Sequence, residues 1–536
     1  MEEDAETDEV DVGAGLSDAS ECASEDSVEC DVFLEALVEV DRDMLEEWSE
    51  RSCSGGRGKG SSGSDSRAKT KSSSPNGSSP DGADWGGEGG ELGVDDDGEL
   101  KVSLSESLSH LRGLVQSPSA SPRDVASLIR AREAKGQLSR LKRARILSEV
   151  LPQGEPELMD VGISRAYSGH FSDDGSVFVA GFQNEAIRLY EVADRAHQQP
   201  WKLRKEVVPR DINWTVTDTV LSPQEPILAY STISPVVHAV KYEWGEDSGA
   251  ENSGASPDAH AALNFGGSNT EAAFGIWALE FSSDGKHLLA GSSDCMTYLY
   301  DVEAQELVFG ATSHLDDVNT VCFAGQDDQV FLSGSDDAMI KCWDKRCGAP
   351  GGPGLSRPQG VLQGHTEGVT YISPRKDGRY FVSNAKDQKL KVWDLRLMGS
   401  PDSKGSKGRV SKFEWDYRWQ DYPGDVETVK HPGDRSVMTF TGHKVVQTLI
   451  RCRWSPAETT GQRYVISGSQ CGGLFVFDTL TGGTAGVLEH HKSVLRDCDW
   501  HPHRPMLASV GWDGHVVRWH NFTDKSEVGG SKKKHK

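Results

Sequence analysis

A twelve-residue pattern recurs along the C-terminal two thirds of the chain, and this repetition constrains the fold more than any other feature. Its two clearest copies are residues 333–344 and residues 383–394, whose tryptophans, Trp343 and Trp393, lie 50 residues apart. Each copy reads as a short apolar strand, a tight polar turn and a second strand in which apolar and polar residues alternate. Repetition at such a period indicates an array of similar small sheets.

Five further copies follow the same pattern more loosely, which gives seven in all. They are residues 180–191, 214–240, 290–301, 467–478 and 509–520. The pattern resembles the WD40 repeat, and Gly364-His365 and Trp393-Asp394 carry the likeness most fully. The resemblance implies an all-β fold, a seven-bladed WD40 β-propeller.

The length of the repetitive region agrees with seven blades. Seven WD40 blades need roughly 280 to 315 residues, whereas residues 163–521 supply 359. The excess lies in two segments, residues 243–272 and residues 397–441, which we interpret as insertions.

In WD40 proteins the turn Asp accepts a hydrogen bond from a His, whose ring reaches a Ser hydroxyl and then the Trp indole. The resemblance implies this tetrad in three blades: His314, Ser333, Asp337 and Trp343 in blade four; His365, Ser383, Asp387 and Trp393 in blade five; His491, Ser509, Asp513 and Trp519 in blade seven. We interpret these Ser, His and Asp residues as structural rather than catalytic. Ala180 and Ala290 occupy the Ser position, so blades one to three are expected to rely on apolar packing, and Cys471 replaces the turn Asp of blade six.

The charge of the protein is concentrated at its N-terminus. Residues 1–100 hold 29 acidic and 7 basic side chains, out of a net charge of −26 for all 536 residues. Rich in Gly, Ser and Asp, this region is predicted to be disordered, although residues 31–48 have the spacing of a helix that folds on a partner. Without a concentrated basic surface, direct nucleic-acid binding is not expected.

Residues 101–162 form a basic linker with helical character. Residues 101–150 carry 10 basic and 4 acidic side chains, and the Ser121 capping pattern predicts helices between Pro122 and Leu147. Packing on the propeller and docking on a separate protein both remain open for these helices. Residues 522–536 read as a basic disordered tail.

Several function classes lack sequence support. The sequence has no apolar run of membrane-spanning length, and its ten cysteines form no Cys-x-x-Cys pair, so we expect no membrane partner and a location in nucleus and cytoplasm. His490, His491, His501 and His503 cluster in sequence, but no Cys or carboxylate follows at metal-ligand spacing. With no phosphate-binding loop or nucleophile elbow, we expect no metal, no cofactor and no enzyme activity.

Blades four and five each end in Trp-Asp-x-Arg, with Arg346 and Arg396 in the last position. The two boxes resemble the motif with which substrate receptors of cullin-4 RING ubiquitin ligases bind the damaged-DNA-binding adaptor. The planar guanidinium suits such an interface because it makes several charge-assisted bonds at once. The resemblance assigns adaptor binding to Arg346 and Arg396, together with Asp337, Trp343, Asp344, Asp387, Trp393 and Asp394. Lys345 inside the first box departs from the pattern.

Segments outside the repeats indicate which group of WD40 proteins the sequence resembles. Residues 210–214, 415–419 and 448–456 are similar to the WD repeat-containing protein twenty-three group, the eleventh type of cullin-4-associated factor. Membership implies a substrate receptor that presents an unknown protein for ubiquitination. Candidate substrate contacts, just before the inner strands, are Trp214, Phe274, Asp316 and Glu367. The alternative is a nuclear scaffold in RNA-processing or chromatin complexes.

Overall fold

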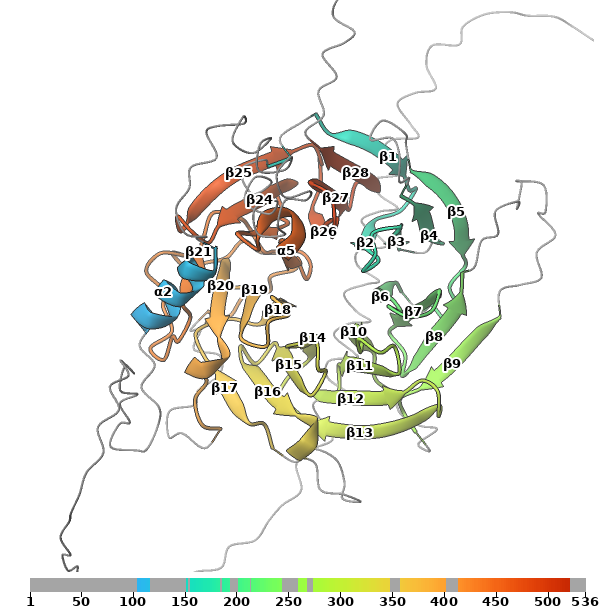
Figure 1. Cartoon of the computed structure of the whole chain (residues 1–536), viewed down its shortest axis with the longest axis horizontal. Coiled ribbons are helices and arrows are strands. Elements are labelled where there is room, and N and C mark those ends of the chain that lie inside the picture. The colour runs from blue at the N-terminus through green and yellow to red at the C-terminus, as the bar shows by residue number, and fades with distance from the viewer. Residues whose placement is uncertain are drawn as a thin grey trace, which may run out of the picture. The chain divides into compact units, whose positions relative to one another are not determined.

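Seven four-stranded antiparallel sheets surround a central axis (Figure 1). The computed structural model describes residues 104–115, 151–152, 155–183, 186–192, 201–212, 214–242, 259–267, 273–347, 357–401 and 413–520. The predicted seven-bladed WD40 propeller is therefore confirmed. The predictions for residues 1–100, for the helices between Pro122 and Leu147 and for the tail at residues 522–536 concern residues outside this description.

The blades follow one another in sequence order, each from its inner to its outer strand. Blade one holds β2 (Ala166–Phe171), β3 (Val177–Phe182), β4 (Ile187–Glu191) and β5 (Lys202–Val207); blade two holds β6 (Val216–Leu221), β7 (Ile227–Thr232), β8 (Val236–Lys241) and β9 (His260–Asn264); blade three holds β10 (Ile276–Phe281), β11 (His287–Ser292), β12 (Met296–Asp301) and β13 (Glu306–Thr312); blade four holds β14 (Val318–Phe323), β15 (Val330–Ser335), β16 (Ile340–Asp344) and β17 (Gly360–Leu362). Blade five holds β18 (Val369–Pro374), β19 (Tyr380–Ala385), β20 (Lys389–Asp394) and β21 (Met438–Phe440); blade six holds β22 (Cys452–Trp454), β23 (Tyr464–Ser467), β24 (Gly473–Asp478) and β25 (Gly483–Glu489); blade seven holds β26 (Leu495–Trp500), β27 (Met506–Gly511), β28 (His515–His520) and β1 (Glu157–Val161).

The ring is closed by pairing an early strand with the last blade. β1 pairs antiparallel with β28, with Glu157 opposite Arg518 and Val161 opposite His515. The first strand of the propeller therefore begins at Glu157, before the predicted start at residue 163. The two segments interpreted as insertions also contribute strands, because β9 lies within residues 243–272 and β21 within residues 397–441.

The burial of each strand follows its position in the blade. Every residue of β19 and β27 is buried, since a second strand is covered by neighbouring blades on both faces. The outer strands β13 and β25 expose several positions instead. Glycine permits the closest blade contact: a Cβ on Gly468 would lie 2.2 Å from the carbonyl oxygen of Leu495 in the next blade.

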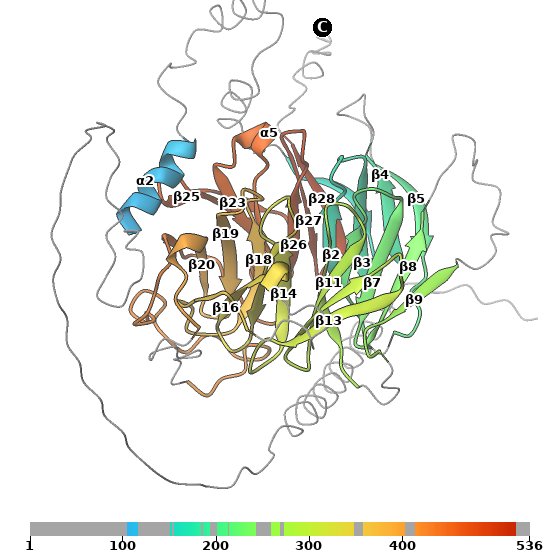
Figure 2. The ribbon, with the colours of Figure 1, turned by 60° about the horizontal axis from the view of Figure 1, so that its bottom comes forward.

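The direction of the strands defines two faces of the propeller. The lower face is the one at which the first and third strands of each blade end. The upper face is the opposite one, at which the first strand of each blade begins and the turn between its second and third strands lies. In the described part of the chain, four short helical segments accompany the strands: α2 (Leu104–Val115), η2 (Lys345–Cys347), η3 (Leu395–Leu397) and α5 (Ala457–Thr460). All but α2 directly follow a first or third strand, and α2 and α5 lie toward the same face (Figure 2).

Candidate adaptor-binding surface

Three blades contain the expected hydrogen-bonded tetrad. In blade five, His365 Nδ1 donates to Asp387, the Ser383 hydroxyl donates to His365 Nε2 at 2.6 Å, and Trp393 Nε1 donates to Ser383 Oγ at 2.7 Å. Equivalent bonds join the predicted tetrads of blades four and seven. The blade-five residues are buried, so the tetrad supports the blade from within.

Blades one to three use tyrosines in addition to apolar packing. The hydroxyls of Tyr190 and Tyr298 donate to Asp160 and Asp294, at 2.6 and 2.5 Å. Tyr230 Oη accepts from the Arg210 amide at 2.8 Å. The expectation of apolar packing alone was therefore incomplete, because a buried tyrosine hydroxyl on a second or third strand needs its own partner.

The Trp-Asp-x-Arg box of blade four forms a compact surface feature. Asp344 ends β16, and its carboxylate accepts from the backbone amide and Nε of Arg346 at 2.9 Å and from its Nη2 at 2.6 Å. These bonds from Arg346 lower the pKa of Asp344. Lys345 places its ammonium 5.3 Å from the centre of the Phe323 ring. The Arg346 side chain remains 64% exposed, so a held guanidinium is presented to solvent.

The box of blade five has the same shape with an added arginine. Arg396 folds back on Asp394 through its amide and through Nη2, at 3.0 and 3.2 Å, and its side chain is 45% exposed. Arg379 Nη2 also donates to Asp394, at 2.8 Å. Burial opposes ionisation of Asp394, but the hydrogen bonds from Arg379 and Arg396 outweigh it and lower its pKa.

Helix α2 packs beside the second box. Leu111 is buried in a cluster that includes Tyr380 and Val382. His110 Nδ1 donates to Tyr380 Oη at 3.0 Å, and Arg379 Nη1 donates to His110 Nε2 at 3.1 Å. Arg379 thus links the helix to Asp394, the same carboxylate that holds Arg396. Helix α2 lies at the outer rim of the ring, beside blade five (Figure 1).

Only part of the predicted adaptor-binding set reaches this surface. Trp343 and Trp393 are buried inside their blades, and Asp337 and Asp387 are buried in tetrad turns at the upper face. Because these four side chains are already used inside their blades, they do not lie on the surface that the boxes present. The arginines, with Asp344 and Asp394 holding them, are what the boxes present.

A third segment reproduces the box on the other face. Arg418 Nε and Nη2 donate to Asp416 at 3.0 and 2.8 Å, as in the blade-four box. Tyr417, however, lies under the Lys386 ammonium, 3.8 Å from its ring centre, and Lys386 belongs to the turn after β19. The segment therefore lies over the upper face, away from Arg346 and Arg396.

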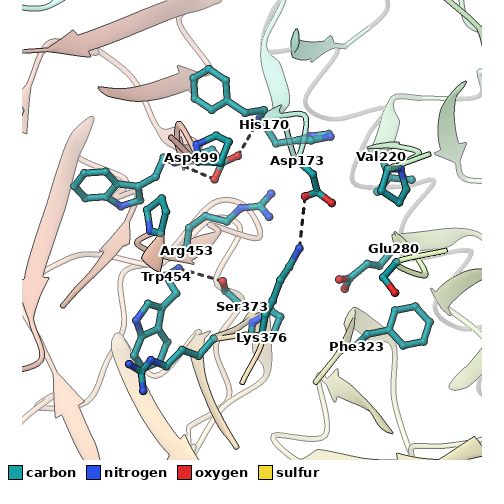
Figure 3. Close-up of a pocket in the computed structure, with 18 of the residues that line it drawn as sticks. His170, Asp173, Val220, Glu280, Phe323, Ser373, Lys376, Arg453, Trp454 and Asp499 are labelled. Atoms are coloured by element: carbon teal, nitrogen blue, oxygen red, sulfur yellow. Dashed lines mark hydrogen bonds and ion pairs between the residues drawn. The ribbon is translucent and has the colours of Figure 1, made fainter. Parts of the chain in front are cut away.

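The lower mouth of the central channel contains a cavity of about 1040 Å³ lined by charged side chains (Figure 3). Lys376 extends across it to Asp173, with 3.5 Å between Nζ and Oδ1. Burial raises the pKa of Glu280 to about 8, and burial also raises that of Asp499 to about 6 although Arg453 opposes it. Among the described residues, no three His, Cys, Asp or Glu side chains are grouped as metal ligands would be.

The four candidate substrate contacts differ in accessibility. Phe274 is 5% exposed and stacks on Tyr298, and Glu367 is 1% exposed. Neither can present its side chain to a substrate, because the blade packing already covers both. Trp214 and Asp316 are half-buried and remain accessible at the upper face.

Comparison with known proteins places the chain in a family. The profile of the WD domain, G-beta repeat, matches residues 266–301, 306–344, 356–394 and 482–520. The LEC14B protein of Lithospermum erythrorhizon is 40% identical over 417 residues, which cover 76% of this chain and 85% of that protein. The chain belongs to the LEC14B family of WD40-repeat proteins. A LEC14B homolog of Prunus armeniaca is 42% identical and covers 72% of this chain and 78% of its own length.

Another relative of this chain is named for an association with DDB1 and CUL4. A protein of Caenorhabditis elegans named DDB1- and CUL4-associated factor 11 homolog is 32% identical over 381 residues, covering 70% of this chain and 64% of its own length. This relative agrees with the group indicated by the sequence motifs. No helix in the described part of the protein is long and apolar enough to cross a bilayer.

Two parts of the candidate surface were missed from sequence. Helix α2 lies before the predicted helices, yet Leu104, Leu108 and Leu111 are spaced as on one helix face, so a signal existed. Arg379 gave no signal of its own, because its role depends on the pairing of Tyr380 with Asp394 across β19 and β20.

Proposed function

We propose that this protein is a non-catalytic substrate-recognition subunit of a cullin-4 RING ubiquitin ligase, and that its lower face binds the damaged-DNA-binding adaptor, DDB1. The observation that carries the proposal is the pair of identical arginine boxes on adjacent blades. Arg346 and Arg396 are each folded back on an aspartate and exposed on one face. The name of the C. elegans relative supports the same partners.

The boxes suit the binding of backbone carbonyls or carboxylates. A guanidinium has five N–H donors, and Asp344 takes two of those of Arg346, through Nε and Nη2. The remaining donors point away from the aspartate in a fixed plane. Because the side chain is already held, binding costs less conformational entropy than it would for a free arginine.

Helix α2 extends the proposed interface. It lies beside Arg396 through the shared Arg379 and is fixed by Leu111 under the helix. The receptor would act by position alone: the adaptor holds the lower face while the upper face holds a protein near the conjugating enzyme, which raises the effective concentration of the reacting lysine.

The test is adaptor capture by full-length protein from cell extract. Changing Arg346→Ala and Arg396→Ala together should reduce captured adaptor and cullin-4 at least tenfold, with circular dichroism unchanged. Arg418→Ala is the matched control, since Arg418 has the same local geometry on the upper face. Equal capture by the wild type and the folded double variant would refute the proposal, and co-purification of RNA-processing or chromatin proteins instead would favour the scaffold.

A further inference from the structure

A cluster of aromatic and basic side chains lies at the upper face, where blades one, two and seven meet. It consists of Arg165, Tyr167, Trp214, Arg496 and Trp512, and we call it the upper-face cluster. The Tyr167 ring centre lies 5.8 Å from that of Trp214 and 6.0 Å from that of Trp512. Arg496 lies over Tyr167 at 4.9 Å, and Arg165 lies over Trp512 at 4.4 Å. These contacts make the five side chains one continuous group.

Arg496 is a buried cation with too few acceptors. Arg496 is 4% exposed. Its Nε donates to Thr448 Oγ1 at 3.2 Å, but its Nη1 has no hydrogen-bond partner among the described residues. Burial, together with the nearby Arg451, lowers the pKa of Arg496 to about 10. A buried guanidinium donor without an acceptor is costly, so such a group is expected to meet an acceptor in the bound state.

The carboxylates next to Arg496 are already engaged elsewhere. Asp218 accepts from Arg451 Nη2 at 2.7 Å and from the Leu279 amide at 2.9 Å. Asp497 accepts from Arg451 Nη1 at 3.1 Å and from the Gly169 amide at 3.0 Å. Both carboxylates attract the charge of Arg496, but they accept their hydrogen bonds from Arg451 and backbone amides, so the Arg496 guanidinium donates to neither of them.

Two indole N–H groups in the same cluster also lack a hydrogen-bond acceptor among the described residues. Trp214 Nε1 and Trp512 Nε1 are both inaccessible to solvent and have no hydrogen-bond partner among the described residues. With Arg496 Nη1 they make three unsatisfied groups, all donors. Both indole rings are only half-buried, so ring surface remains accessible beside the donors.

We propose that the upper-face cluster binds a carboxylate of a peptide segment in the protein to be ubiquitinated, with a neighbouring apolar side chain of that peptide against the indole rings. A carboxylate supplies an acceptor for unsatisfied donors of this cluster and places a negative charge beside Arg165 and Arg496. The carboxylate can belong to Asp, to Glu or to the free C-terminus of the peptide. The inference rests on the proposed function, and it names the substrate class for the face opposite Arg346 and Arg396.

Three pools of acetylated octapeptides test the site. The pools differ at one central position, which is Glu in the first, Gln in the second and Lys in the third, and all other positions are Gly, Ser, Leu or Phe. Each pool is made in two forms, one with a free and one with an amidated C-terminus. Each pool passes over immobilised full-length protein, and retained peptides are measured by mass spectrometry. We expect at least fivefold more retention of the amidated Glu pool than of the amidated Gln and Lys pools. Retention that requires a free C-terminus instead assigns the site to the terminal carboxylate.

Two variants separate this site from general attraction of charge. Arg165→Gln should remove most of the preference for a carboxylate, and Trp214→Phe with Trp512→Phe should reduce it about threefold, since phenylalanine keeps a ring but loses the donor. Arg418→Gln, also on the upper face but held by Asp416, is the matched control and should leave the carboxylate preference unchanged. Equal retention of all pools, or a full preference in both folded variants, overturns the inference.

Adaptor capture by the same preparations distinguishes the two proposals. Arg165→Gln should leave capture unchanged, because Arg165 lies on the other face. Failure of the wild type to capture adaptor refutes the ligase role whatever the peptides show, whereas normal capture without carboxylate preference refutes only the upper-face site.

Discussion

Blades five and six are neighbours that satisfy the same buried histidine in different ways. In blade five, His365 bonds to Asp387 and Ser383 of its own blade. In blade six, Cys471 stands where the turn Asp would be, and His443 Nε2 instead donates to Asn384 Oδ1 of blade five, at 2.7 Å. Asn384 Nδ2 in turn donates to Ser467 Oγ of blade six, at 3.1 Å. A polar link within one blade has been replaced by a link between two.

The comparison shows what a closed ring permits. A blade can lose its internal tetrad when an adjacent strand supplies the missing partner, since every blade has a neighbour on each side. The replacement is less complete, because His443 Nδ1 is buried without a partner among the described residues. Blade five should therefore depend on its turn residue far more than blade six does.

The largest expected effect is at the turn of blade five. Asp387→Ala should lower the free energy of unfolding by about 3 kcal/mol, because His365 and the Thr366 amide lose a buried acceptor. Urea denaturation followed by tryptophan fluorescence measures it. Cys471→Ala, at the same position of blade six, should change stability by less than about 0.5 kcal/mol. Similar losses from both would contradict the comparison.

Acid should weaken the wild type partly through His443. Burial lowers the pKa of His443 to about 4 in the folded protein, against about 6.5 when unfolded. Between these values the unfolded state binds more protons, so stability falls as the pH drops from 6.5 toward 4.

Replacing His443 by Gln should make this fall smaller by roughly 2 kcal/mol. The measurement is urea denaturation at pH 6.5, 5.5 and 4.5; identical slopes for the wild type and His443→Gln would show that His443 does not carry the effect.

The link between the blades should be weaker than the tetrad. Asn384→Ala should cost about 1 to 2 kcal/mol, because His443 and Ser467 lose their partner. In the His443→Gln background the same change should cost less, as a double-mutant cycle would measure. Additive losses would mean that the two side chains do not act together.

Restoring the turn residue of blade six should have the smallest effect. Cys471→Asp should change stability by less than about 1 kcal/mol, since His443 would only exchange Asn384 for an acceptor in its own blade. In this background Asn384→Ala should lose most of its cost. If Asn384→Ala costs the same free energy of unfolding in this background, His443 still bonds to Asn384 and not to the new aspartate.

The sequence predicted those features that repeat. Seven copies of one pattern predicted seven blades, and the Ser and Asp of each tetrad lie at fixed offsets from Trp343, Trp393 and Trp519, so one copy located the others. The boxes could be found for the same reason. Burial could not be read in this way, which is why Phe274 and Glu367 were placed on a surface that their packing removes.

Features made by segments far apart in sequence could not be predicted. Tyr167 and Arg496 are separated by most of the propeller, and they meet only because blades one and seven are adjacent in the closed ring. The five residues of β1 carry too short a pattern to identify a strand. Asn384 gave no sign of its role in blade six, because that role depends on the contact between blades.

The pairing of β1 with β28 has a consequence for synthesis on the ribosome. β1 emerges first among the described strands, and its partner follows about 360 residues later. At about 5 to 20 residues per second, the first strand waits roughly 20 to 70 seconds for its partner. During that time β1 is an unpaired edge that can add to other sheets. Newly made protein should therefore need a chaperone until blade seven has been translated and can pair with β1.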